Sequence, residues 1–207
     1  MLDKDLILIG YSGHALVIAE VAIENGISII GYSDTKPALL DPFKLEYLGF
    51  EKDQDFIGWK KDYSFILGIG DNYLRQSIAK IIANKNKKIK TIIHSSASIS
   101  ASSVIGSGTF INRNVTVNAL AVIGKNVILN TGCIVEHECV LEDAVHIAPG
   151  AVLAGNVYIG ERSFVGANAV IIQGIVIGKD VIIGAGSVVI KDVQDGRKIV
   201  GNPSREI

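Results

Sequence analysis

Residues 123–159 read IGKNVILNTGCIVEHECVLEDAVHIAPGAVLAGNVYI, and every sixth residue of this stretch is Ile, Leu or Val. The same period continues in both directions without a break, from Ile93 to Val189. Four residues after each of these positions stands a mostly small or β-branched residue, as at Ala121, Cys133 and Ala151. A strict period of six over about a hundred residues is the signature of a parallel β-helix.

The period has a physical reading. Six residues make one short strand and one corner, and three such units close a triangular coil. The Ile, Leu and Val positions, called anchors below, point inward and stack on the anchors of neighbouring coils, ~4.8 Å away. Gly106, Gly124 and Gly160 directly follow anchors, where we expect corners to need permissive backbone. A β-sandwich is the alternative, but sandwiches do not keep this period, and the pattern itself leaves the hand of the coil open.

The preceding residues follow a different pattern, in which apolar strands alternate with helices. The predicted elements are strands at 6–9, 27–32 and 65–69, turns at 10–14 and 70–72, and helices at about 15–24 and after residue 72. In the second helix, Leu74, Ile78, Ile81 and Ile82 are expected on one face. The alternation predicts a Rossmann-like α/β domain over residues 1–90, followed by the β-helix over residues 91–207.

The turn after the first strand bears on ligand binding. A dinucleotide fingerprint needs glycine at positions 10, 12 and 15, and the chain has Gly10, Ser12 and Ala15, which argues against NAD. The helix that follows still offers backbone N–H groups to an anion, and Asp34 ends a strand where acidic groups accept hydroxyl hydrogen bonds. The diphosphate of a nucleotide sugar is the predicted ligand. A plain helix cap at Ser12 and a turn role for Asp34 stay open, whereas an exposed His14 has little packing purpose.

Composition excludes several function classes. The net charge of -1, with basic and acidic residues mixed, gives no footprint for nucleic acid. No apolar run approaches the ~20 residues of a membrane helix, and the start of the chain lacks a secretory pattern, so a cytoplasmic protein is expected. Cys133 and Cys139 occupy inward positions of successive hexads, which favours neither a disulfide nor a metal pair.

Two of the four histidines lie inside the repeat. His137 stands two residues past an anchor and should point away from the interior, where a neutral imidazole can accept a proton. Glu136 and Glu138 flank it and are placed to orient the ring. A surface histidine in an acidic strand is the alternative. His146 is nine residues away with no third imidazole nearby, so no metal site is predicted.

The chain resembles a known family through four motifs. These are I-x-x-G-x-S-G-H-A from Ile7, I-G-D-N from Ile69, I-V-E-H-E-C from Ile134 and V-G-N-P from Val200. Together they are similar to the bacterial hexapeptide-repeat sugar acetyltransferases, the group of the UDP-4-amino-sugar N-acetyltransferases and sialic acid O-acetyltransferases. The resemblance implies a left-handed β-helix, a homotrimer and acetyl-CoA as co-substrate.

The resemblance also implies roles for individual residues. His137 would be the general base, with Glu138 raising its basicity. The implied sugar-nucleotide residues are Ser12, Gly13, His14, Asp34, Gly70, Asp71 and Asn72. The implied acetyl-CoA residues, in a groove between two prisms, are Asn130, His146, Gly155, Ala167 and Ala185. Tyr11 is bulkier than the usual residue of this turn, which leaves the preferred nucleobase and sugar open.

The function expected on this basis is N-acetylation of the 4-amino group of a nucleotide-linked 4-amino-4,6-dideoxy sugar, by direct transfer and with no metal. O-acetylation of sialic acid or a related hydroxyl acceptor by the same scaffold is the alternative. A scaffold protein that has lost catalysis is a third interpretation, against which the presence of His137, Glu138 and the N-terminal turn argues.

Overall fold

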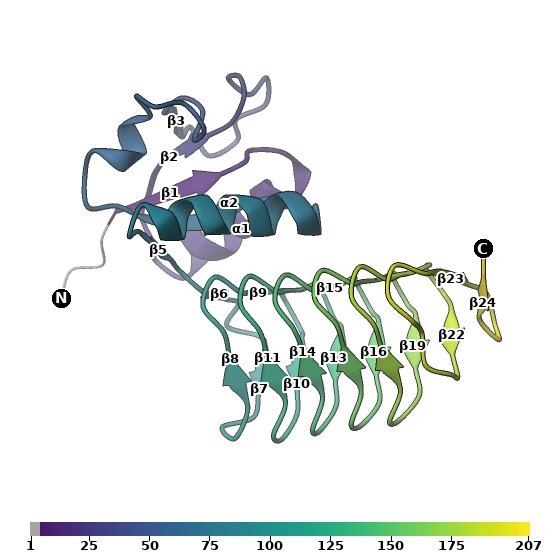
Figure 1. Cartoon of the computed structure of the whole chain (residues 1–207). Coiled ribbons are helices and arrows are strands. Elements are labelled where there is room, and N and C mark those ends of the chain that lie inside the picture. The colour runs from purple at the N-terminus through teal and green to yellow at the C-terminus, as the bar shows by residue number, and fades with distance from the viewer. Residues whose placement is uncertain (1–4) are drawn as a thin grey trace. The chain divides into compact units, whose positions relative to one another are not determined.

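The computed structural model describes residues 5–207 (Figure 1). The chain forms two compact units that meet in the sequence between Ile92 and Ile93. Within the described residues, no helix is long and apolar enough to cross a bilayer.

The N-terminal unit is built on a five-stranded parallel sheet of order β3-β2-β1-β4-β5. Its elements are β1 (Leu6–Ile9), α1 (Gly13–Glu24), β2 (Ile29–Ser33), β3 (Glu46–Tyr47), the 3-10 helix η1 (Ile57–Trp59), β4 (Ser64–Leu67), α2 (Asn72–Asn84) and β5 (Lys88–Ile89). All four residues of β1 are buried, because this strand lies in the middle of the sheet. The predicted Rossmann-like α/β organisation is confirmed.

Some boundaries differ from the prediction. Helix α1 begins at Gly13, two residues before the predicted start at 15, because the extended backbone of Ser12 (φ -127, ψ -171) takes the N-cap position. Leu74 shares the helical spacing of Ile78 on α2, as predicted, but it is 43% exposed, whereas Arg75 beside it is buried. The first turn of α2 borders a pocket, so Leu74 lines that pocket rather than the core.

The C-terminal unit is the predicted left-handed β-helix, and its short strands form three parallel stacks (Figure 1). The first face consists of β6 (Ile92–Ile93), β9 (Phe110–Ile111), β12 (Ile128–Leu129), β15 (His146–Ile147), β18 (Phe164–Val165), β21 (Ile182–Ile183), β23 (Lys198–Val200) and the antiparallel β24 (Arg205–Glu206). The second face consists of β7 (Ser98–Ile99), β10 (Thr116–Val117), β13 (Ile134–Val135), β16 (Val152–Leu153), β19 (Val170–Ile171) and β22 (Val188–Val189). The third face consists of β8 (Val104–Ile105), β11 (Val122–Ile123), β14 (Val140–Leu141), β17 (Tyr158–Ile159) and β20 (Val176–Ile177).

The interior of the prism is a continuous aliphatic column. Anchors such as Ile123, Leu129 and Val135 are at most 1% exposed, and they pack in one cluster with the small residues that stand four positions later in each hexad. Cys133 and Cys139 belong to this cluster and are free thiols. Removing this much aliphatic surface from water is the main stabilising term of the unit.

The corner residues that need a left-handed backbone do not stand directly after the anchors, where they were predicted. Every sixth residue from Gly108 to Gly186 has a positive φ, and this position lies three residues after the anchor, not directly after it. Gly106 and Gly160 directly follow anchors for another reason. A Cβ on either would lie within 3 Å of the backbone of the next coil, so these glycines permit close stacking.

Candidate functional site

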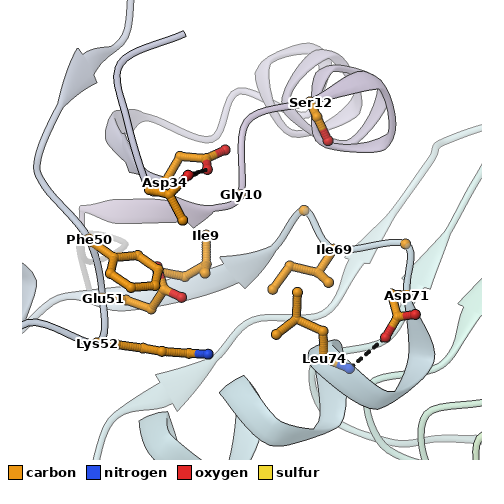
Figure 2. A pocket seen from close by; sticks show the side chains of 13 residues that line it. Ile9, Gly10, Ser12, Asp34, Phe50, Glu51, Lys52, Ile69, Asp71 and Leu74 are labelled. Carbon is orange, nitrogen blue, oxygen red and sulfur yellow. Dashed lines mark hydrogen bonds between the residues drawn. The ribbon is translucent and has the colours of Figure 1, made fainter.

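The N-terminal unit contains a pocket of about 370 Å³ at the carboxyl ends of β1 and β4 (Figure 2). This is the edge of a parallel sheet where such folds bind ligands. Its lining residues are Ile9, Gly10, Ser12, Asp34, Thr35, Phe50, Glu51, Lys52, Gly68, Ile69, Gly70, Asp71 and Leu74. The structure thus brings four predicted residues, Ser12, Asp34, Gly70 and Asp71, into one pocket, whereas Gly13, His14 and Asn72 do not line it.

Ser12 and Asp34 face this pocket from neighbouring loops. The Ser12 side chain makes no capping hydrogen bond to α1, although the residue stands at the N-cap. Asp34 Oδ2 accepts from the backbone N–H of Tyr11 (3.0 Å), and Oδ1 accepts from the backbone N–H of Thr35 (2.6 Å). The carboxylate therefore holds the two loops together and keeps lone pairs for a ligand hydroxyl.

Tyr11 does not fill the pocket. Its ring is buried and stacks on Tyr32 with centroids 4.1 Å apart, and its hydroxyl donates to Asp41 Oδ1 at 2.6 Å. Burial and this hydrogen bond raise the pKa of the phenol. The bulk of Tyr11 is thus taken up inside the unit, away from the ligand side of the turn.

The Gly70-Asp71-Asn72 turn is fixed from below by Arg75, which sequence reasoning missed. The guanidinium is 1% exposed and donates to the carbonyls of Ile69 (3.1 Å) and Gly70 (3.0 Å) and to Asn72 Oδ1 (2.9 Å). Asp71 caps α2 by accepting from the N–H of Leu74 at 2.7 Å. A charged residue on the same helical stripe as Ile78 and Ile82 was the available signal.

His14 lies on α1 beside the same turn. A Cβ added at Gly70 would lie 3.9 Å from the Cβ of His14, so the first turn of α1 and this turn meet here. Burial, together with the charge of Arg75, lowers the pKa of His14 to about 4. The imidazole is therefore neutral near physiological pH, and the expectation of an exposed ring is wrong because its side chain is mostly buried.

On the β-helix, His137 and Glu138 form an exposed pair at the corner that follows β13. The distance from His137 Nδ1 to Glu138 Oε2 is 3.0 Å, and the two side chains are 51% and 57% exposed. The Oε2 of Glu136 accepts instead from Asn118 Nδ2 at 2.8 Å. Of the two flanking carboxylates, Glu138 is the one that orients the imidazole.

Gly155 lies one coil further on, directly against the His137 ring. A Cβ at this position would come within 2.5 Å of His137 Nε2. The N–H of Asn156 donates to the carbonyl of His137 at 2.8 Å, so the two coils are also tied through the backbone. Glycine at 155 thus leaves the space that the ring occupies.

The remaining predicted co-substrate residues lie elsewhere on the prism. Asn130, Ala167 and Ala185 occupy the corner between the first and second faces, and His146 lies on the first face. Asn130 Nδ2 is 3.5 Å from His146 Nε2. His137 and Gly155 occupy the next corner, between the second and third faces, so within one chain a whole face separates the two groups.

Asn112 orders the first of these groups, and sequence reasoning missed it. It is 1% exposed and donates to Asn130 Oδ1 at 3.0 Å and to Thr131 Oγ1 at 2.8 Å. Its bond to Oδ1 turns the other end of the Asn130 amide toward His146. Stacked asparagines one coil apart were the signal in the sequence.

Other reactive groups are few. Burial raises the pKa of Cys133 to about 12 and also raises the pKa of Cys139, so both thiols stay protonated. Across residues 5–207, no group of three or more His, Cys, Asp or Glu side chains is arranged to hold a metal ion.

Comparisons with known proteins agree with this organisation. The model of the PglD N-terminal domain matches residues 5–82, and that of the bacterial transferase hexapeptide (six repeats) matches residues 156–191. A search of curated proteins gives no significant match.

Several solved structures are similar over nearly the whole chain. PerB from Caulobacter crescentus, in complex with CoA and GDP-perosamine, is 34% identical, with a TM-score of 0.91 over 98% of this chain and 97% of that one. The acetyltransferase domain of PglB from Neisseria gonorrhoeae FA1090, in complex with acetyl coenzyme A, is 32% identical, with a TM-score of 0.92 over 99% and 100%. WeeI from Acinetobacter baumannii AYE shares the fold at 24% identity, with a TM-score of 0.87 over 98% and 99%. The resemblance found in the sequence motifs is confirmed, and the chain belongs to the hexapeptide-repeat sugar N-acetyltransferases, a family of acetyl-CoA-dependent acyltransferases.

Proposed function

We propose that this chain transfers the acetyl group of acetyl-CoA to the 4-amino group of a nucleotide-linked 4-amino-4,6-dideoxy sugar. The similarity to PerB, which is bound to CoA and GDP-perosamine, supports an amino-sugar acceptor over a hydroxyl acceptor. The N-terminal pocket supports a nucleotide, since it combines a helix N-terminus at Ser12 with a strand-end carboxylate at Asp34. In this proposal Gly13, His14 and Asn72 shape the two turns around the ligand.

The observation that carries the mechanism is the hydrogen bond between His137 and Glu138. An ionised carboxylate only accepts, so Nδ1 carries the proton and Nε2 presents a lone pair. An amine must be neutral to attack a thioester, and Nε2 is the group that takes its proton. The amine nitrogen of the sugar bonds to the carbonyl carbon of the acetyl group, and its proton passes to Nε2 of His137. The thioester C–S bond then breaks. CoA leaves as a thiolate and takes a proton from the imidazolium.

Two further features support direct transfer. Neither cysteine is a competent nucleophile, because both thiols are packed in the prism core with raised pKa values. Gly155 lies against the His137 ring, and its backbone N–H makes no hydrogen bond within residues 5–207. In this proposal it donates to the oxyanion that forms on the acetyl oxygen.

Homotrimer formation is part of the proposal. The catalytic corner carries His137 and Gly155, and the corner next to it carries Asn130, Ala167 and Ala185, with His146 nearby. Because one face separates these corners in a single chain, a site that uses both needs one corner from each of two copies. Three copies related by a threefold axis supply three such pairings.

The test is a thiol-release assay with acetyl-CoA and a panel of acceptors: GDP-, UDP- and dTDP-linked 4-amino-4,6-dideoxy sugars, and free sialic acid. CoA release with an amino sugar, together with an acetylated amide product, supports the proposal. Acetylation of sialic acid alone contradicts it and favours the hydroxyl acceptor. No release with any acceptor also contradicts it.

A further inference from the structure

Glu51 is a buried acid that the mechanism does not use. Its side chain lines the N-terminal pocket, yet the residue is only 6% exposed. Ser33 Oγ donates to Glu51 Oε2 at 2.7 Å, and within residues 5–207 this is the one hydrogen bond of the carboxylate. Its other oxygen, Oε1, has no donor within residues 5–207 and is not fully enclosed, so it is open to a hydrogen-bond donor. The pocket is where a donor for Oε1 can enter.

The walls beside Glu51 suit a flat ring. Figure 2 shows the ring of Phe50 on one side of the pocket and the side chains of Ile69 and Leu74 on the other. Apolar surfaces on two sides with a polar group between them are how sites hold aromatic ligands. A nucleobase has this form, and Asp34 stands in the same pocket at the strand end that usually receives the ribose.

The acceptor character of Glu51 discriminates between bases. Guanine presents two adjacent donors on its pairing edge, N1–H and the 2-amino group, and one carboxylate accepts both. Uracil and thymine present a single N–H between two carbonyl oxygens, which would face the carboxylate oxygens unfavourably. Adenine and cytosine present one donor beside an acceptor nitrogen.

We propose that Glu51, held by Ser33, recognises guanine, and that the amino sugar is therefore linked to GDP. Lys52, which also lines the pocket, adds a donor suited to guanine O6. The inference deepens the proposed function and rests on it for the identity of the acceptor. PerB, 34% identical, is bound to GDP-perosamine, which is the same class of nucleotide.

Calorimetric titration of the full chain with GDP, UDP, dTDP and ADP tests the proposal. The wild type should bind GDP at least about tenfold more tightly than the others, the discrimination of one bidentate base contact. Glu51→Gln keeps an oxygen for Ser33 but turns an amide N–H₂ toward the two guanine donors. This variant should bind GDP about tenfold or more weakly than the wild type does, and its affinity for UDP should not fall. Glu46→Gln, the same change at an exposed position of β3, should alter neither.

The contradicting results are distinct. Equal or tighter binding of UDP or dTDP by the wild type overturns the proposal without any variant. The proposal is also overturned if Glu51→Gln, shown by circular dichroism to be folded, loses affinity for all four nucleotides to the same extent. That result would mean that Glu51 contacts the ribose, which all four share. GDP selectivity that depends on Glu51 in a protein without acetyl transfer refutes the proposed function alone. Acetylation of UDP-linked sugars in preference to GDP-linked ones refutes only the inference on guanine.

Discussion

At the scale of single residues, the proposed proton acceptor is His137, and one hydrogen bond to Glu138 sets the direction of its ring. Nδ1 is engaged by Glu138 at 3.0 Å, so proton uptake is confined to Nε2. Gly155 allows Nε2 to lie where it does, because a Cβ at position 155 would overlap the His137 ring. The proposed reaction thus depends on a position that carries no functional group of its own.

Gly155→Ala should remove most of the activity while the fold persists. Its Cβ would come within 2.5 Å of His137 Nε2, and the ring, as a side chain on an open corner, can move away. We expect kcat to fall about 10²-fold, the usual contribution of a general base, with a melting temperature near that of the wild type.

Gly160→Ala is the matched control for that variant. Here the Cβ would come within 2.6 Å of the backbone of Gly178 and Lys179, which cannot move aside. The melting temperature should fall markedly, and the activity of the protein that remains folded should be kept. The account of Gly155 is contradicted if the two variants lose stability to the same extent.

His14 should make the stability of the N-terminal unit depend on pH. Its pKa is lowered to about 4 by burial, whereas in an unfolded chain it is 6.5. Between these values the unfolded chain binds a proton that the folded chain does not, so the free energy of unfolding falls as the pH falls through this window. In His14→Gln this loss, measured by urea unfolding at about pH 7 and about pH 5, should be smaller.

Trp59, the one tryptophan of the sequence, packs against Phe56 and Phe65 in the N-terminal unit, so its fluorescence reports that unit. His94→Gln on the β-helix is the control. It should leave the loss in the free energy of unfolding between about pH 7 and about pH 5 the same as in the wild type. An identical pH dependence in wild type and His14→Gln would show that His14 titrates normally.

The sequence predicts some of these residues and not others, for a physical reason. His137 and Glu138 lie within a strict repeat, so their outward position follows from counting residues from the anchor. Glu51 lies in an irregular segment between β3 and η1, where no period tells which side chain turns inward. Its hydrogen-bond donor, Ser33, is 18 residues away in sequence.

At the scale of elements, helix α2 joins the core to the pocket. Its buried face carries Ile78 and Ile82 toward the sheet, and its first turn carries Arg75 under the Gly70-Asp71-Asn72 turn. The guanidinium has lost its hydration, and this burial lowers its pKa to about 9. The helix thus presents the turn with its carbonyls tied down and the Asp71 cap in place.

Arg75→Met should therefore loosen the pocket as well as destabilise the unit. The carbonyls of Ile69 and Gly70 lose their donor, at a cost of about 2 kcal/mol or more in the free energy of unfolding. Nucleoside diphosphate affinity, measured by calorimetry, should fall with it. Lys80→Met, an equal loss of charge on the exposed face of the same helix, should change neither quantity. Unaltered nucleotide affinity in a destabilised Arg75→Met would limit Arg75 to a structural role.

Elements show where pattern reasoning succeeds and fails. The positions of the β-helix strands can be predicted directly from the anchors, because every coil packs its anchors against those of the neighbouring coils in the same way. Helical spacing does not tell which residues in the first turn of α2 are buried, because it does not show where the sheet ends and a pocket begins. Leu74 and Ile78 share the spacing of one face, yet only Ile78 reaches the core.

At the scale of the whole molecule, the three faces of the prism separate groups that one active site would need. The corner with His137 and the corner next to His146 lie on either side of the second face. The second face carries half-buried apolar side chains outward, among them Ile134, Val152 and Val170. A trimer that covers such faces would bury this surface and join the two corners from neighbouring copies.

Light scattering should therefore give a mass three times the 22.0 kDa of the chain. His137→Ala and His146→Ala should each be nearly inactive alone. When the two variants are unfolded and refolded together, random assortment should restore about a quarter of the sites. Variants refolded separately and then mixed without exchange are the control. An active monomer, or no recovery in the co-refolded mixture, would refute a site shared between copies.

The most direct measurement of the central claim is the turnover of His137→Asn with acetyl-CoA and an amino-sugar nucleotide, alongside calorimetric binding of acetyl-CoA. The account predicts that kcat falls at least about 10²-fold while acetyl-CoA affinity stays close to that of the wild type. His94→Asn is the matched control, since the Nδ1 of His94 is likewise hydrogen-bonded, 2.7 Å from Ser96 Oγ, and it should keep full turnover. Turnover of His137→Asn within a few-fold of the wild type would show that another group accepts the proton.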